Sequence, residues 1–173
     1  MIATGAVAPP RGVASPDMVQ TGDIVDDFEL PDQTGTKRKL SELLASGPVV
    51  LFFYPAAMTY GCTKESCHFR DLGAEFAAVG ATRVGISRDS VDKQSQFAAK
   101  HNFDYPLLSD EDRAVANAFG VASGFKLGPV KRSTFVIDQD RRVLAVINSE
   151  LNFNKHADQA LAVLKSRTGP SAS

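Results

Sequence analysis

The stretch from Val49 to Cys62, "VVLFFYPAAMTYGC", places an uninterrupted apolar run directly before a proline, a glycine and a cysteine. The run from Val49 to Tyr54 contains no charged residue, which predicts a strand buried on both faces at the centre of a sheet. Pro55 has no backbone N–H to donate, so we expect the strand to end there. Every other predicted element is arranged around this strand.

A helix and a second strand follow it. The segment "ATRVGIS", residues 81–87, predicts the second strand. Between the two strands, apolar residues recur at spacings of three and four, which predicts a helix that packs on the sheet. They are Phe69, Leu72, Phe76 and Val79. The order strand, helix, strand predicts a parallel pair joined by a crossover.

The flanking segments continue this α/β pattern. Before the central strand, short strands surround the turn "DQTG", and a helix opens at Ser41. After residue 89 the predicted elements are helices at 91–101 and 113–119, a strand within "FDYPLLSD" (103–110), an antiparallel hairpin of "STFVID" (133–138) and "VLAVIN" (143–148), and a last helix marked by Ala157, Ala160, Leu161 and Leu164.

The composition is typical of one globular domain, with 173 residues, 43% hydrophobic and 23% charged. Residues 1–17 are mostly Ala, Gly, Val and Pro without periodicity, which predicts a flexible N-terminal extension. We expect the domain to span residues 18–168 and the tail, residues 169–173, to be disordered.

Charge and hydropathy exclude several partners. The formal net charge is −1, so no basic excess is present to bind nucleic acid or an anionic membrane surface. No apolar run approaches the ~20 residues that cross a bilayer. The N-terminus has no basic segment before its apolar residues, and Pro9 and Pro10 interrupt them, unlike a signal peptide. These features predict a cytoplasmic, reducing location.

The chain has only two cysteines, Cys62 and Cys67, and three interpretations compete: a disulfide staple, a metal site or a reactive thiol. Two cysteines are too few for a disulfide scaffold, and a core of this size does not need one. A zinc site at Cys62, Cys67 and His68 lacks a fourth ligand and the usual cysteine spacing. We therefore predict no metal.

The predicted helix gives the two thiols different positions. Cys62 falls in its first turn, where free amide groups and the helix dipole favour the nucleophilic thiolate. Cys67 lies about 140° around and ~7.5 Å along the axis. A disulfide needs α-carbons within about 7 Å, so the pair can bond only if the first turns unwind. This geometry excludes a permanent staple.

Simpler interpretations remain open at this point. Cys62 could be an inert core residue. Cys67 could be a tolerated surface thiol, in which case an external thiol would react with an oxidised Cys62. Arg132 could be a solvated charge at a strand edge. His68 is expected to be half-exposed near Glu65 or Asp71. The phenylalanines are expected to be core residues.

The motif Pro55, three residues, Thr59, two residues, Cys62 resembles that of the peroxiredoxins, the thiol peroxidases of the thioredoxin fold. "CTKESCHFRD" is similar to the Q branch, also called bacterioferritin comigratory proteins. Further matches are "DFELPDQTG", "VVLFFYP", "DYPLLSD" and "RSTFVID", so the resemblance covers about residues 18–164. It implies an α/β thioredoxin fold with a central mixed β-sheet flanked by helices.

The resemblance also implies a role for each motif residue. Cys62 would be the peroxidatic nucleophile, and Thr59 would hold its hydroxyl near the thiolate and the peroxide. Arg132 would stabilise the thiolate and the breaking O–O bond, and Pro55 would shield the thiolate. Cys67 would resolve the sulfenic acid as an intramolecular disulfide, which a thioredoxin-like protein then reduces.

The implied substrates are hydrogen peroxide and organic hydroperoxides, without a cofactor. The branch implies a monomer, with a dimer as the alternative. One position departs from the family pattern, because Tyr60 replaces the proline that commonly follows the motif threonine. Two other functions stay open: a thiol-disulfide oxidoreductase, which normally needs Cys-x-x-Cys, and a redox-sensing or chaperone-like binding module.

Overall fold

The computed structural model describes residues 18–122 and 129–167. The predicted N-terminal extension (1–17) and tail (169–173) lie outside the described residues, as do residues 123–128. Among the described helices, none is long and apolar enough to cross a membrane.

A five-stranded mixed sheet forms the centre of the molecule, in the order β5-β4-β3-β6-β7. The strands are β3 Val49–Phe53, β4 Thr82–Ser87, β5 Leu107–Ser109, β6 Ser133–Ile137 and β7 Val143–Asn148. β3 pairs in parallel with β4, and β4 with β5. β6 pairs antiparallel with β3 on one side and with β7 on the other. The predicted parallel crossover, the hairpin and the mixed sheet are confirmed.

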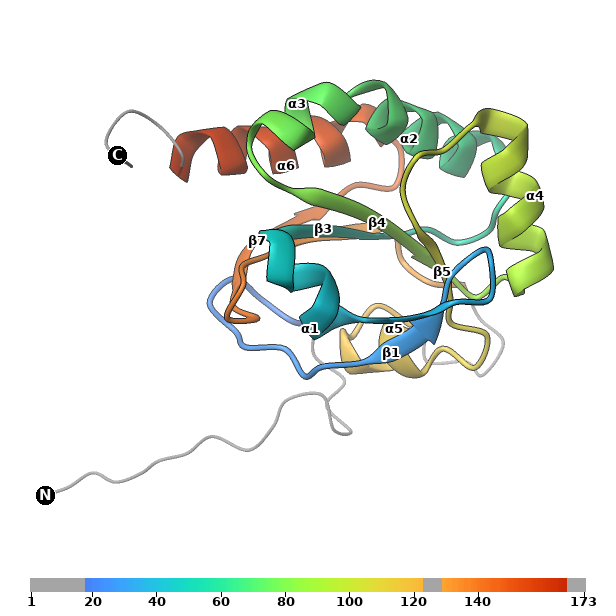
Figure 1. The fold of residues 1–173 in the computed structure, drawn as a ribbon, viewed down its shortest axis with the longest axis horizontal. Helices are drawn as coiled ribbons and strands as arrows, with labels where there is room; N and C mark the ends of the chain where they lie inside the picture. The colour runs from blue at the N-terminus through green and yellow to red at the C-terminus, as the bar shows by residue number, and fades with distance from the viewer. Residues whose placement is uncertain (1–17, 123–128, 168–173) are drawn as a thin grey trace, which may run out of the picture.

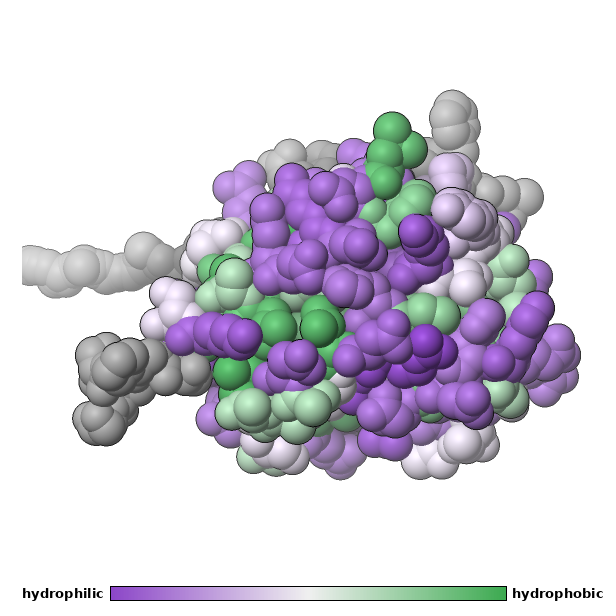
Figure 2. Space-filling view, turned by 90° about the horizontal axis from the view of Figure 1, so that it is seen from above, coloured by the Kyte–Doolittle hydropathy of each residue, from purple (hydrophilic) through white to green (hydrophobic). Residues whose placement is uncertain are grey.

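Helices cover both faces of the sheet (Figure 1). One face carries the long helices α2 Tyr60–Asp71, α4 Val91–His101 and α6 Phe153–Arg167, together with the short α3 Gly73–Ala78. The other carries α1 Leu40–Leu43 with the 3-10 turn Leu44–Ser46, α5 Ala114–Ala118, and the hairpin of β1 Glu29–Pro31 and β2 Lys37–Lys39. Seen from the side of the long helices, the surface is mostly hydrophilic (Figure 2).

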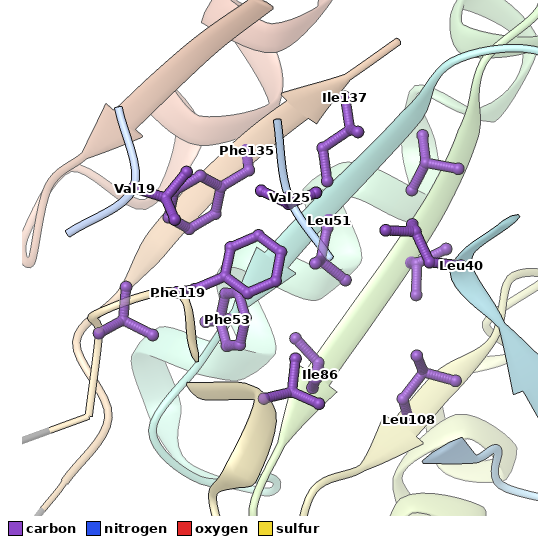
Figure 3. Close-up of a cluster of buried hydrophobic side chains, with 14 of the residues drawn as sticks. Val19, Val25, Leu40, Leu51, Phe53, Ile86, Leu108, Phe119, Phe135 and Ile137 are labelled. Atoms are coloured by element: carbon purple, nitrogen blue, oxygen red, sulfur yellow. The ribbon is translucent and has the colours of Figure 1, made fainter. Parts of the chain in front are cut away.

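The central strand β3 lies between two hydrophobic clusters, as its uninterrupted apolar run predicts. Leu51 and Phe53 point into one cluster, together with Ile86, Phe119 and Phe135 (Figure 3). The intervening residues of β3 point into the cluster under the long helices. All five residues of β3 are buried.

The predicted helix between β3 and β4 is divided in two at Leu72, which has φ −93° and ψ 18°. The guanidinium of Arg83, from β4, is the physical reason. Its Nη1 donates to the carbonyl oxygen of Phe69 at 2.9 Å, which would otherwise accept the amide of Gly73 in a continuous helix. A Cβ at Gly73 would lie 3.2 Å from the same guanidinium, so the side chain fills the space at the junction.

Candidate active site

The loop after β3 and the first turn of α2 place Cys62. Thr59, in an extended conformation, is the N-cap residue, and Cys62 is the third residue of the helix. The backbone N–H of Ala57 donates to Asp89 Oδ2 at 2.7 Å, which holds the loop against the end of β4. The predicted position of Cys62 in the first turn is confirmed, and its side chain is fully buried.

The sheet register brings Arg132 to this thiol. Because β6 runs antiparallel to β3 with Ser133 opposite Phe53, the residue before β6 lies where β3 ends and the loop to α2 begins. Arg132 Nη1 lies 3.5 Å from Cys62 Sγ. The side chain is only 7% exposed. The interpretation of Arg132 as a solvated edge charge is therefore wrong.

Glu65 is the second partner of Arg132, a role that the sequence analysis did not predict. Its Oε1 accepts from Arg132 Nη1 at 2.8 Å, and its side chain is completely buried. Burial raises the pKa of Glu65 to about 8, and the nearby Arg132 offsets only part of this effect. Glu65 follows Cys62 by three residues and so lies on the same helix face, which is the signal that could have identified it.

Burial by itself would lower the pKa of Arg132, but the neighbouring Cys62 and Glu65 outweigh it and raise the pKa. The guanidinium therefore keeps its positive charge beside the sulfur. Its central carbon also lies 4.9 Å from the centre of the Phe153 ring. The buried cation therefore lies 3.5 Å from the Cys62 sulfur, where it can stabilise negative charge that develops during a reaction.

His156, at the start of α6, is a further buried group beside Glu65. Its Nε2 lies 2.8 Å from the Ser149 carbonyl oxygen, which can only accept, so Nε2 carries the proton. Burial lowers the pKa of His156, which favours the neutral ring. Nδ1 then accepts from the Thr134 hydroxyl at 2.8 Å and cannot donate to Glu65 Oε2, which is 3.6 Å away.

Phe153 and Tyr60 form the outer wall of the site. Their rings meet edge to face with centroids 6.2 Å apart, and Tyr60 is 75% exposed. Phe153 is only half-buried and covers the guanidinium of Arg132, so the prediction that the phenylalanines are all core residues is wrong for this one. A Cβ at Gly61 would lie 2.6 Å from the Phe153 ring, which explains the glycine at this position.

The other two motif residues lie in the same loop. Pro55 is half-buried, two residues after the end of β3. Thr59 is exposed, and its hydroxyl donates to the Ala56 carbonyl oxygen at 2.8 Å. The structure thus brings Cys62 and Arg132 into direct contact, while the Thr59 hydroxyl donates its proton to a carbonyl oxygen of its own loop.

Cys67 lies on a different side of α2, as the helical geometry predicts. Both cysteines are free, with Cys62 buried and Cys67 partly buried. Burial raises the pKa of the Cys67 thiol, although Arg70 opposes the effect, so the folded helix favours its protonated form. The adjacent His68 contacts Asp158 of α6 at 2.7 Å rather than the predicted Glu65 or Asp71.

No group of three or more His, Cys, Asp or Glu side chains within residues 18–122 and 129–167 has an arrangement that could hold a metal ion.

A five-stranded mixed sheet with a cysteine buried at a helix start beside an arginine is the arrangement of a thioredoxin-fold protein. The chain belongs to the AhpC/TSA family, whose model matches residues 21–146. Its relatives place it among the thiol peroxidases called peroxiredoxins, in the Q branch.

Two curated relatives illustrate the similarity. A Mycobacterium tuberculosis protein named as a peroxiredoxin is 66% identical over 149 residues, which cover 85% of this chain and 97% of the relative. The chloroplastic peroxiredoxin Q of Sedum lineare is 40% identical over 148 residues, covering 86% of this chain and 79% of the relative.

Solved structures agree with this assignment. The crystal structure of the peroxidoxin BcpB from Mycobacterium tuberculosis superposes with a TM-score of 0.84 at 66% identity, over 87% of this chain and 98% of that one. Peroxiredoxin Q of Xanthomonas campestris gives a TM-score of 0.75 at 35% identity, over 82% of this chain and 92% of that one. The predicted fold and the predicted resemblance are both confirmed.

Proposed function

We propose that this thiol peroxidase uses Cys62 as its peroxidatic cysteine and Cys67 as its resolving cysteine. The observation that carries the proposal is the distance of 3.5 Å between Cys62 Sγ and the buried Arg132 guanidinium. A thiolate held beside a fixed cation is a strong nucleophile that needs no metal or cofactor.

In the first step the Cys62 thiolate attacks the near oxygen of a hydroperoxide. The S–O bond forms while the O–O bond breaks, and the departing oxygen takes a proton and leaves as water or an alcohol. Arg132 stabilises the negative charge that moves from the sulfur to the departing oxygen. Glu65 Oε1, 2.8 Å from Arg132 Nη1, holds the guanidinium in this position.

Thr59 and Pro55 shape the approach of the peroxide. The Thr59 hydroxyl donates to Ala56, so its oxygen keeps a lone pair that can accept the proton of an incoming hydroperoxide. Pro55 fixes the backbone where β3 ends and limits the access of water to the thiolate. Both residues would act before the O–O bond breaks, by orienting the substrate.

In the second step Cys67 attacks the sulfenic acid on Cys62 after the first turns of α2 unwind. The two cysteines lie on different sides of the intact helix, with Cys62 buried and Cys67 partly buried, so a local opening is required. A thioredoxin-like protein would then reduce the intramolecular disulfide. The proposal includes a cytoplasmic location, where such reductants maintain thiols.

A monomer is sufficient for this cycle, because both thiols come from one chain. Two alternatives fit the site less well. A thiol-disulfide oxidoreductase needs two thiols that pair in the folded state, whereas four residues separate these. A redox-sensing or chaperone-like module would change its surface on oxidation without turnover.

The test is the intact mass of the protein after one equivalent of hydrogen peroxide, followed by alkylation of the remaining thiols. We expect the wild type to lose both thiols as an intramolecular disulfide, and Cys67→Ser to stop at a sulfenic acid on Cys62. A reduced Cys62 would exclude peroxidase activity, and oxidation of Cys62 without Cys67 would place the resolving thiol in another molecule. Steady consumption of NADPH with a thioredoxin system would exclude the sensor function.

A further inference from the structure

The two halves of α2 are held in place very differently. The first half, residues 60–65, begins without a side-chain cap, since Thr59 makes no capping hydrogen bond, and its first turn contains no acidic residue. Its second residue is Gly61, which loses more backbone entropy on folding than any other residue type. The helix start therefore lacks a local cap, and its tertiary contacts include those of the Cys62 and Glu65 side chains with Arg132.

The second half of α2 is anchored through its backbone. The Tyr105 hydroxyl donates to the Ser66 carbonyl oxygen at 2.7 Å, and Arg83 Nη1 donates to that of Phe69 at 2.9 Å. Both donors are buried, with Tyr105 4% and Arg83 9% exposed. The Phe69 ring also stacks on Phe52 with centroids 4.1 Å apart. These contacts favour retention of the helix from Ser66 onward.

Ser66, at the boundary between the halves, carries an unused hydroxyl. The residue is fully buried, and Ser66 Oγ has no hydrogen-bond partner within the part of the chain that the structure describes. A buried polar group without a partner destabilises the state that contains it. Serine is also among the best N-cap residues, where its oxygen accepts the amide of a residue two or three positions ahead.

We propose that Ser66 is the hinge of the resolving step and becomes the N-cap of a shortened α2. Residues 60–65 unwind, and Ser66 Oγ accepts the backbone amide of His68 or Phe69. The carbonyl group of an N-cap residue keeps its helical position, so the bond from Tyr105 to Ser66 is present in both states. The proposal rests on the proposed role of Cys67.

The chemical step at this hinge is balanced without a further reactant. Cys67 sulfur attacks the sulfenic sulfur of Cys62, so an S–S bond forms and the S–O bond breaks. The departing hydroxide combines with the proton from the Cys67 thiol and leaves as water. Because Cys67 directly follows the hinge, it stays at the start of the retained helix while Cys62 moves toward it.

The test compares the stability of the disulfide in three variants, measured by equilibrating each with dithiothreitol and counting alkylated thiols by intact mass. In Ser66→Ala the oxidised state loses its cap and the reduced state loses an unpartnered hydroxyl. Both changes favour the dithiol, so we expect a shift of about ten-fold, or ~30 mV. Ser109→Ala is the matched control, because Ser109 Oγ is also buried without a partner but lies in β5.

Tyr105→Phe provides the second test. We expect it to lower the thermal stability but to leave the dithiol–disulfide equilibrium unchanged, because its hydrogen bond is present in both states. A shift of this variant toward the disulfide would mean that unwinding passes Ser66, which would overturn the proposal. Equal equilibria for the wild type and Ser66→Ala would also overturn it. If the wild type forms no disulfide between Cys62 and Cys67, the proposed function itself fails, which is a different result.

Discussion

Replacing Arg132 with methionine removes the cation beside Cys62 while keeping an unbranched chain in place of the arginine stem. The guanidinium Nη1 lies 3.5 Å from the sulfur in a buried site. Two unit charges about 4 Å apart interact by about 4 kcal/mol at the effective dielectric constant of about 20 that describes protein sites. This value is an upper limit for the loss of stabilisation.

The expected loss is smaller, because Glu65 responds to the substitution. Without Arg132 the carboxyl group loses the cation that lowers its pKa, so it stays protonated and places no new charge beside the thiol. The loss of one electrostatic donor typically costs about 3 kcal/mol of transition-state stabilisation. We therefore expect Arg132→Met to react with hydrogen peroxide roughly 150-fold more slowly than the wild type.

The assay is a single turnover of the reduced protein, quenched by acid and alkylation and followed by intact mass. Lys131→Met is the matched control, because this neighbouring side chain is exposed, and we expect it to react at the wild-type rate. Circular dichroism verifies that both variants fold. If Arg132→Met keeps more than about a tenth of the wild-type rate constant, the electrostatic role of Arg132 is refuted.

Three further predictions concern residues around the thiol and in the core. The variant Glu65→Gln removes the titrating carboxyl group. In the wild type the pKa of Glu65 is about 8 in the folded state, above the ordinary 4.5, so the free energy of unfolding of the wild type should fall relative to that of the variant as the pH rises from 4.5 to 8. Urea unfolding measures this difference, and the opposite trend would contradict the prediction. Gly61→Ala places a Cβ 2.6 Å from the Phe153 ring, so we expect a destabilisation of about 2 kcal/mol in urea that Phe153→Leu relieves; additive effects would contradict the contact. Leu51→Ala, at a fully buried position of β3, should cost about 3 kcal/mol by urea unfolding, and a cost below about 1 kcal/mol would contradict its core position.

Local sequence patterns predicted most of the elements correctly. The apolar run at 49–54 gave the central strand, and the segment 91–101 matches α4 at both ends. These predictions depend on periodicity and on chain breakers, which act within one element. The break at Leu72 could not be predicted in this way, because Arg83 from the next strand causes it.

The features of the candidate site also fall into those that local sequence predicts and those that depend on tertiary contacts. The sequence by itself determined that Cys62 starts a helix and that Cys67 faces elsewhere, because helical geometry is local. Only the tertiary structure decided that Arg132 contacts Cys62, because that contact depends on the register of β6 against β3. The burial of Glu65 was decided in the same way, since it depends on helix and strand packing rather than on neighbouring residues. Burial and charge pairing depend on contacts between residues that are far apart in the chain, so no local sequence pattern encodes them.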